Sequence, residues 1–420
     1  MDNKIFLSTK NKFIEIKEEE LRINGIMFKE KVGDTTVEYK LSHNGITETV
    51  LTKKALELSQ DYYIKSLEKL VSAEKLLVLT GAGSSKDDEL FGGKLMSELW
   101  RIISFLNIEN FNFESFLDKL NISQDIKDKF DLEMILSKAK LYLEFKTDDC
   151  LSNHVKIIEE TILKECSFSL KDKSIHLDFI KKLTSRKSKQ NRLKIFTTNY
   201  DKAFEEAGAE GGYVIIDGFS FTQPRKFSGK YFDYDIVIRE NSRTSSTENF
   251  ANNVFHLYKL HGSVNWEKKD NDIIQIDSPA KAMMIYPNSN KYESSYEQPY
   301  FEMMSRFQSE LRKNGTSTLI CIGFSFADKH IFTMTNEALN QNPSLNLVII
   351  EPFINPSVNE NFKKLFELSK KSSQILIIGE FFKDFVSNLP FSQYLNSNGE
   401  NSHRRAFLWA DFQRISYGAV

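Results

Sequence analysis

Residues 75–83 read KLLVLTGAG, a short apolar run that ends in two glycines one residue apart. An unbroken apolar run of this length is typical of a strand buried on both faces of a parallel sheet. The glycines that follow allow a sharp turn and a close approach of the backbone to a ligand. The stretch therefore predicts the first strand of an α/β domain, opening into a glycine turn.

Similar runs recur along the rest of the chain. Four are apolar and a fifth alternates; they lie at 193–197, 318–322, 347–350, 374–378 and, alternating, 254–260. Segments with helical spacing separate most of them. Strands that alternate with helices indicate a doubly wound parallel sheet with right-handed crossovers. We therefore expect a Rossmann-like α/β fold.

The flanking segments have a different character. Residues 1–52 hold short strand candidates between turn signals and predict a β-rich appendage, packed on the main domain or separate from it. Residues 53–392 form the predicted main domain. Within it, residues 95–190 are mostly of helical pattern, with few Gly or Pro, and predict a large insertion. Residues 393–420 predict a linker and C-terminal tail.

The composition excludes several classes of protein. The 420 residues include 56 basic and 58 acidic side chains, so the chain lacks the basic bias of a nucleic-acid binder. No apolar window is long enough for a membrane span, and the N-terminus lacks the pattern of a signal peptide. Three widely spaced cysteines argue against disulfides and against a four-cysteine zinc site. We expect a cytoplasmic protein with no membrane contact.

Polar residues follow the first strand at 80–85, which read TGAGSS. Such a turn can bring backbone N–H groups close to a phosphate. The third glycine of a complete dinucleotide fingerprint is missing, because Lys86 stands there. The candidates are Gly81, Ala82, Gly83 and Ser84, and an ordinary tight turn is the alternative.

Two further polar segments follow strands. Thr198, Asn199 and Asp201 come after the strand at 193–197, where a helix N-cap is the alternative role. His261 ends the alternating strand and is followed by glycine, so it can act as a general base near neutral pH. His256 is expected on the opposite face of that strand, in a structural role.

The strand at 318–322 leads into a second glycine turn. Gly323 and Ser325 could hold a ribose or a phosphate, and Glu351 closes the next strand, where a carboxylate can bind ribose hydroxyls. For Asp328 and His330 we favour helix capping and packing. The carboxyl ends of parallel strands share one edge of the sheet, so all four polar segments are expected to meet there.

Taken in this order, the four segments resemble the sirtuin-like NAD-binding family. Its members carry a Gly-Ala-Gly loop, a Thr-x-Asn-x-Asp motif, a His-Gly pair and a later Gly-x-Ser loop. The matching positions are 81–83, 197–201, 261–262 and 323–325. The chain lacks the Cys-x-x-Cys pairs of deacylase sirtuins. It is more similar to the sirtuin-like domains of bacterial antiviral defence systems, which hydrolyse NAD, and among these to a subunit partnered by a HerA-type ATPase.

The resemblance implies an NAD glycohydrolase that takes NAD as its substrate, needs no zinc, and releases nicotinamide and ADP-ribose. It implies that Asn199 orients the nicotinamide ribose and the attacking water, that His261 accepts a proton, and that Asp201 supports the nicotinamide end. The residues implied to contact the rest of NAD are Gly81, Ala82, Gly83, Ser84, Thr198, Gly323, Ser325 and Glu351. Because uncontrolled hydrolysis would be toxic, we expect regulation through a homo-oligomer and a HerA-type partner.

Other readings of the same residues remain open. A module that binds NAD or ADP-ribose without turnover would need the same glycine turns. An NAD-dependent protein deacylase would share the Asn199 and His261 motifs, but normally carries the zinc cysteines that are missing here. A nuclease or nucleic-acid binder is the least favoured alternative, given the near-neutral charge.

Overall fold

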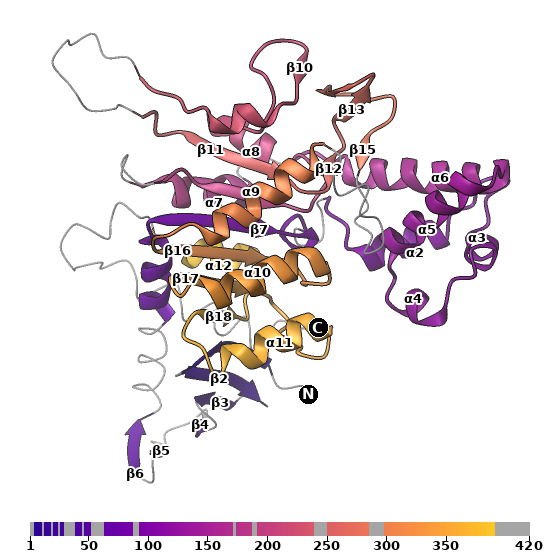
Figure 1. Cartoon of the computed structure of the whole chain (residues 1–420). Coiled ribbons are helices and arrows are strands. Elements are labelled where there is room, and N and C mark those ends of the chain that lie inside the picture. The colour runs from indigo at the N-terminus through magenta and orange to yellow at the C-terminus, as the bar shows by residue number, and fades with distance from the viewer. Residues whose placement is uncertain are drawn as a thin grey trace.

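The computed structural model describes residues 4–10, 12–17, 20–23, 26–28, 38–43, 46–51, 63–86, 92–170, 174–186, 191–238, 250–284 and 298–390. Within these ranges, a mostly parallel sheet forms the centre and helices cover both of its faces (Figure 1). Its parallel strands are β7 (Lys75–Thr80), β8 (Lys194–Thr197), β9 (Val214–Ile216), β11 (Val254–Lys259), β16 (Ser317–Ile322), β17 (Leu345–Ile350) and β18 (Ile375–Ile378). The predicted Rossmann-like α/β fold is confirmed.

The strand order reverses direction beside β7. Strands β8, β11 and β9 lie on one side of β7, and β16, β17 and β18 lie on the other. Thr80 at the end of β7 is in register with Thr197 of β8 and with Ile322 of β16. The loops that follow β7 and β16 therefore begin at the same level of the sheet, where the strand order changes direction. This topological switch point is where open α/β sheets bind ligands.

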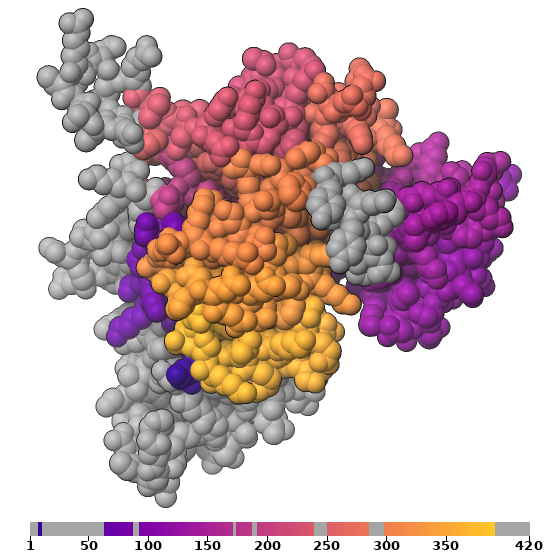
Figure 2. Space-filling view, viewed as in Figure 1, coloured from indigo at the N-terminus to yellow at the C-terminus, as the bar shows by residue number. Residues whose placement is uncertain are grey.

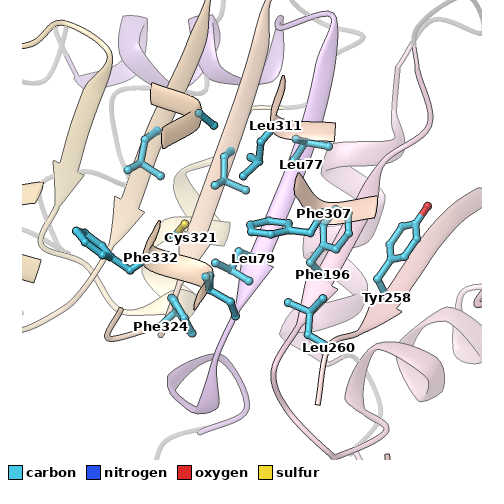
Figure 3. Close-up of a cluster of buried hydrophobic side chains, with 14 of the residues drawn as sticks. Leu77, Leu79, Phe196, Tyr258, Leu260, Phe307, Leu311, Cys321, Phe324 and Phe332 are labelled. Carbon is cyan, nitrogen blue, oxygen red and sulfur yellow. The ribbon is translucent and has the colours of Figure 1, made fainter. Parts of the chain in front are cut away.

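Successive residues of β7 point to opposite faces of the sheet, and both faces are buried. Leu76 and Val78 pack on one side, and Leu77 and Leu79 on the other. Figure 3 shows the second cluster, in which Phe307 packs edge-on against Phe196 with ring centroids 4.9 Å apart. Burial on both faces explains why the strands read as continuous apolar runs.

Each face has its own set of helices. The Leu76 face carries a helix over 63–71 together with α7 (Ile175–Thr184), α8 (Ala203–Glu210) and α12 (Phe382–Asn388). The Leu77 face carries α9 (Tyr300–Arg312), α10 (Lys329–Gln341) and α11 (Glu360–Ser369).

A separate group of helices projects beyond the sheet (Figures 1 and 2). This helical lobe, residues 96–166, consists of α2 (Met96–Ser104), α3 (Phe113–Lys119), α4 (Gln124–Asp128), α5 (Leu132–Phe145) and α6 (Asp149–Cys166). The stretch expected as an insertion, 95–190, also includes α7. That helix packs on the sheet instead of joining the lobe. No helix among the described residues is both long and apolar enough to cross a membrane.

The N-terminal strands extend the main sheet. In sequence order they are β1 (Lys4–Thr9), β2 (Lys12–Lys17), β3 (Glu20–Ile23) and β4 (Ile26–Phe28), each antiparallel to the one before. β1 pairs antiparallel with β18, with Leu7 opposite Ile378. A second antiparallel pair, β5 (Glu38–His43) and β6 (Ile46–Leu51), is outside this sheet. The predicted tail at 393–420 lies outside the described residues.

Short strands lie before and after the parallel strand β11 in the sequence. β12 (Gly262–Ser263), directly after His261, pairs with β15 (Met283–Met284). A small sheet is formed by β10 (Arg225–Lys226), β13 (Trp266–Lys269) and β14 (Asp272–Gln275). These pairings fix the course of the chain just beyond the edge of the main sheet.

Truncation of Leu7 tests whether β1 belongs to the folded core. The side chain is fully buried, so Leu7→Ala should lower the free energy of unfolding by about 2–5 kcal/mol, measured by denaturant titration. The exposed Lys10 provides the control Lys10→Ala, which should change it little. Equal stability of the two variants would place β1 outside the cooperative unit.

Candidate active site

The two glycine turns touch each other at the switch point. The Gly83 N–H donates to the Gly323 carbonyl at 3.0 Å, and the Gly81 N–H donates to the Ile322 carbonyl at 3.1 Å. Gly323 has φ of +57°, and a Cβ there would stand 2.4 Å from the Gly83 carbonyl carbon. The contact is therefore backbone to backbone, and only glycine leaves room for it.

Hydrogen bonds within the protein already use four amides of the first turn. Besides Gly81 and Gly83, the N–H of Ser84 donates to the Gly81 carbonyl, and the N–H of Ser85 donates to Ala82. The Ser84 hydroxyl also donates to the Gly81 carbonyl, at 2.8 Å. A diphosphate at this edge would consequently have to meet other donors than these.

Asn199 is held by the first turn. Its amide nitrogen donates to the Gly81 carbonyl at 2.9 Å and to the Ser85 hydroxyl at 2.7 Å, and lies 3.3 Å from the Ser84 hydroxyl. Because a carbonyl can only accept, the contact with Gly81 fixes which end of the amide is nitrogen. The side chain therefore keeps its carbonyl oxygen for another donor.

Asp201 holds the Ser85 hydroxyl that contacts Asn199. One carboxylate oxygen accepts from the Ser85 hydroxyl at 2.7 Å, and the other accepts from the Ala203 N–H at 3.0 Å, at the start of α8. The residue at the N-cap of α8 is Lys202, so Asp201 contacts the helix start from one residue before the cap, and it is linked through Ser85 to Asn199. In this structure Asp201 acts through its neighbours.

A buried lysine anchors the same loop. Lys259, almost fully buried at the end of β11, donates to the carbonyls of Tyr200 and Asp201 and pairs with Glu205 at 3.0 Å. Burial raises the pKa of Glu205, although the Lys259 charge opposes the rise. Lys259 is a functional residue that the motifs in the sequence do not mark, although a lysine inside an apolar strand signals a buried partner.

His261 lies between two carboxylates. Its Nε2 is 3.3 Å from Asp328 Oδ2, and its Nδ1 is 4.0 Å from Glu133 Oε1. Asp328 caps α10 with its other oxygen, which accepts from the N–H groups of His330 and Ile331. The capping expected for Asp328 is therefore present, but it involves only one of the two carboxylate oxygens, and the other faces His261.

These carboxylates determine the charge of the imidazole. Burial lowers the pKa of His261, but contact with Asp328 and the charge of Glu133 outweigh it, so the pKa is raised overall. Burial raises the pKa of Asp328, but His261 and the capping amides lower it overall. The ion pair stabilises the fold below the ordinary imidazole pKa, and this contribution is lost as pH rises through the raised pKa of His261.

Three buried polar atoms at this edge have no well-aligned hydrogen-bond partner among the described residues. They are Thr80 Oγ1, His261 Nε2 and Asp328 Oδ2. Thr80 ends β7, and the other two atoms face each other. Buried polar atoms are rarely left in this state, and these three belong to segments that end or begin at the switch-point edge, where open α/β sheets bind ligands.

The other expected residues occupy more peripheral positions. Thr198 bridges to the Thr80 carbonyl through its N–H, at 3.0 Å, and its hydroxyl. Ser325 is exposed, and its hydroxyl accepts from the Ala327 N–H. Glu351 follows β17, and burial raises the pKa of its carboxyl. Within the described residues, no hydrogen bond or ion pair joins Ser325 or Glu351 to Asn199 or His261.

Two other histidines, His256 and His330, lie in different surroundings. His256 is buried within β11, with Nδ1 3.4 Å from the Tyr258 hydroxyl. Burial, helped by the nearby Lys194 charge, lowers the pKa of His256 to about 4. His330 is exposed on α10. Among the described residues, no group of three or more His, Cys, Asp or Glu side chains is placed to hold a metal ion.

Glycine substitutions test the contact between the two turns. Gly323→Ala should distort the site and lower the free energy of unfolding by more than the roughly 1–2 kcal/mol of a left-handed backbone alone. Gly212→Ala is the matched control, because Gly212 has φ of +66° but no atom within 4 Å of an added Cβ. Denaturant titration of both variants separates steric contact from backbone strain. Equal losses would show that the close contact does not matter.

Comparison with known proteins adds one match. Residues 193–364 match the family model of the SIR2-like domain, whose members use NAD. No curated protein matches the chain. The matched segment runs from β8 into α11 and contains Asn199, Asp201, His261 and Gly323. It supports the resemblance to the sirtuin-like family over these residues.

Proposed function

We propose that this chain hydrolyses NAD at the bond between nicotinamide and ribose. The observation that carries the proposal is that Asn199 and His261 follow the neighbouring parallel strands β8 and β11 at the switch-point edge, within the segment that matches the SIR2-like domain. Asn199 is tied to the first glycine turn, and His261 faces Asp328 just beyond the second. Both motifs thus border one edge of the sheet.

The reaction makes modest demands on such a site. Water attacks C1 of the nicotinamide ribose and the C–N bond breaks, giving nicotinamide, ADP-ribose and one proton. The cationic ring takes the bonding electrons and leaves neutral, so it needs no general acid. Positive charge builds on the ribose, and the enzyme must orient the bond and the water. The carboxylates of Asp328 and Glu133 supply negative charge at this edge.

Within the described residues, Asn199 has a free amide oxygen that fits this chemistry, and His261 has Nδ1, which lies 4.0 Å from Glu133 and so beyond hydrogen-bond distance. Asn199 can accept a hydrogen bond from water or a ribose hydroxyl through its amide oxygen, because its nitrogen is already engaged. When its imidazole is neutral, His261 can accept the proton that the attacking water loses. Asp201 holds Asn199 in place through Ser85. We assign the adenosine ribose to Ser325 and Glu351, farther along the edge.

We also propose a cellular setting, which rests on the resemblance stated above. NAD depletion would serve antiviral defence in the cytoplasm, and activity would be controlled in a homo-oligomer with a HerA-type ATPase as partner. Surfaces set such contacts. Size-exclusion chromatography of the chain with and without a HerA-type ATPase would test the assembly.

One alternative has an observation in its favour. Four amides of the first glycine turn, at Gly81 and 83–85, and the amide nitrogen of Asn199 are already hydrogen-bonded within the protein. A glycine turn whose amides are largely engaged also suits a module that binds NAD or ADP-ribose and does not turn it over. The experiments below distinguish the two.

Product analysis tests the hydrolase. The purified chain mixed with NAD, alone and with a HerA-type ATPase, should release nicotinamide and ADP-ribose. Asn199→Ala should abolish most turnover, and His261→Ala should reduce it by about 10²–10⁴-fold, the usual contribution of a general base. The control His330→Ala changes an exposed histidine and should retain activity.

Two results would contradict this proposal. Binding of NAD with no product in any mixture would favour the binding module. Turnover that survives both substitutions would place the chemistry elsewhere on the chain.

The pH dependence of turnover tests the ion pair. Since His261 must be neutral to accept a proton and its pKa is raised, kcat/KM should fall as pH drops through a value above the ordinary 6.5. Asp328→Asn removes the charge but keeps a good N-cap for α10, so it should move this limb to lower pH by about one unit. An unmoved limb would show that Asp328 does not govern the base.

A further inference from the structure

The helical lobe carries a carboxylate into the candidate site. Glu133 lies in the first turn of α5, and its Oε1 is 4.0 Å from His261 Nδ1. The Tyr200 hydroxyl donates to the same oxygen at 3.4 Å. About a quarter of the Glu133 side chain is exposed, whereas the His261 side chain is almost fully buried.

Apolar packing determines where this carboxylate lies. The neighbours of Glu133 on α5, Leu132, Ile135 and Leu136, are fully buried in the core of the lobe. That same core includes Tyr200 and Val264, which come from the segments beside Asn199 and His261. The Val264 N–H donates to the Tyr200 carbonyl at 3.0 Å. The lobe is therefore seated on the residues that flank the site.

Charged and titratable groups from several elements surround His261. Asp328 at the start of α10 faces Nε2, and Glu133 of α5 faces Nδ1. Asp131, the N-cap of α5, adds negative charge near Glu133. Tyr300 of α9 lies close enough to both carboxylates for their charges to raise the pKa of its hydroxyl, after the larger effect of burial.

We propose that Glu133 is a positioning residue for His261: together with Asp328 it holds the imidazole from both sides and strengthens it as a proton acceptor. The role of Glu133 in turnover rests on the proposed hydrolysis, whereas its pairing with His261 does not. The inference makes the helical lobe a part of the active site, because the lobe supplies one of the two carboxylates.

The electrostatics agree with this geometry. Burial raises the pKa of Glu133 to about 7, although the His261 charge opposes the rise. Glu133 therefore changes charge in the range in which an imidazole usually titrates. Above this value the carboxylate is ionised and attracts a proton to His261. Below it the attraction weakens, which leaves Asp328 as the remaining anion in contact.

The test is a direct titration of the histidines in the full chain. NMR of protein labelled at histidine resolves the imidazole signals of the seven residues, and loss of one signal in His261→Gln assigns it. Glu133→Gln should lower the pKa of His261 by about one unit, a tenfold loss of proton affinity. Glu133→Asp should restore part of the shift, because it keeps the charge at a greater distance.

A matched control lies on the same helix. Glu144→Gln makes the same change eleven residues later on α5, roughly 16 Å along the axis, and should leave the His261 titration unchanged. Circular dichroism of all variants confirms that α5 stays folded. An unchanged His261 pKa in folded Glu133→Gln would overturn the proposal, as would an equal shift in Glu144→Gln.

Kinetics of the same variants separate this inference from the proposed function. If NAD is hydrolysed, Glu133→Gln should lower kcat more than it raises KM and should move the acidic limb of kcat/KM to lower pH by about one unit. A shifted His261 titration without any NAD turnover would support the pairing and count against the hydrolase. NAD turnover with an unchanged His261 titration would support the hydrolase and count against the pairing.

Discussion

The close contact between two glycine turns is the constraint on which the rest of the structure depends. Gly83 and Gly323 meet backbone to backbone where the strand order reverses, and an added Cβ on either would stand less than 3 Å from the other turn. Parallel strands β7 and β16 bring these turns to one level of the sheet. Because no side chain occupies the space between them, the polar residues beside each turn border one site.

Much of this arrangement follows from local sequence patterns. The parallel strands, the first glycine turn and the positions of Asn199 and His261 at strand ends were predicted, because apolar runs and glycines report local conformation. The antiparallel pairing of β1 with β18 was not, because pairing partners leave no local signal. The helical insertion was expected, but not that α7 would pack on the sheet.

The charged residues around the candidate site were harder to predict from the sequence. Glu133 lies 128 residues before His261 in a helix whose pattern is ordinary, so only the folded lobe reveals the contact. Asp328 has the sequence pattern of an N-cap and makes those bonds, which conceals its second oxygen. Lys259 with Glu205 anchors the loop after Asn199. In all three, the contact joins segments that are far apart in the chain.

The central claim is that the nicotinamide ribose of NAD lies between Asn199 and His261. A crystal structure of the full chain with carba-NAD, whose ribose ring oxygen is replaced by carbon and which therefore resists cleavage, tests it most directly. The account predicts the nicotinamide ribose within hydrogen-bonding distance of the Asn199 amide oxygen, with the His261 imidazole facing C1 directly or through one water. A ligand whose nicotinamide end lies away from both side chains would contradict the account.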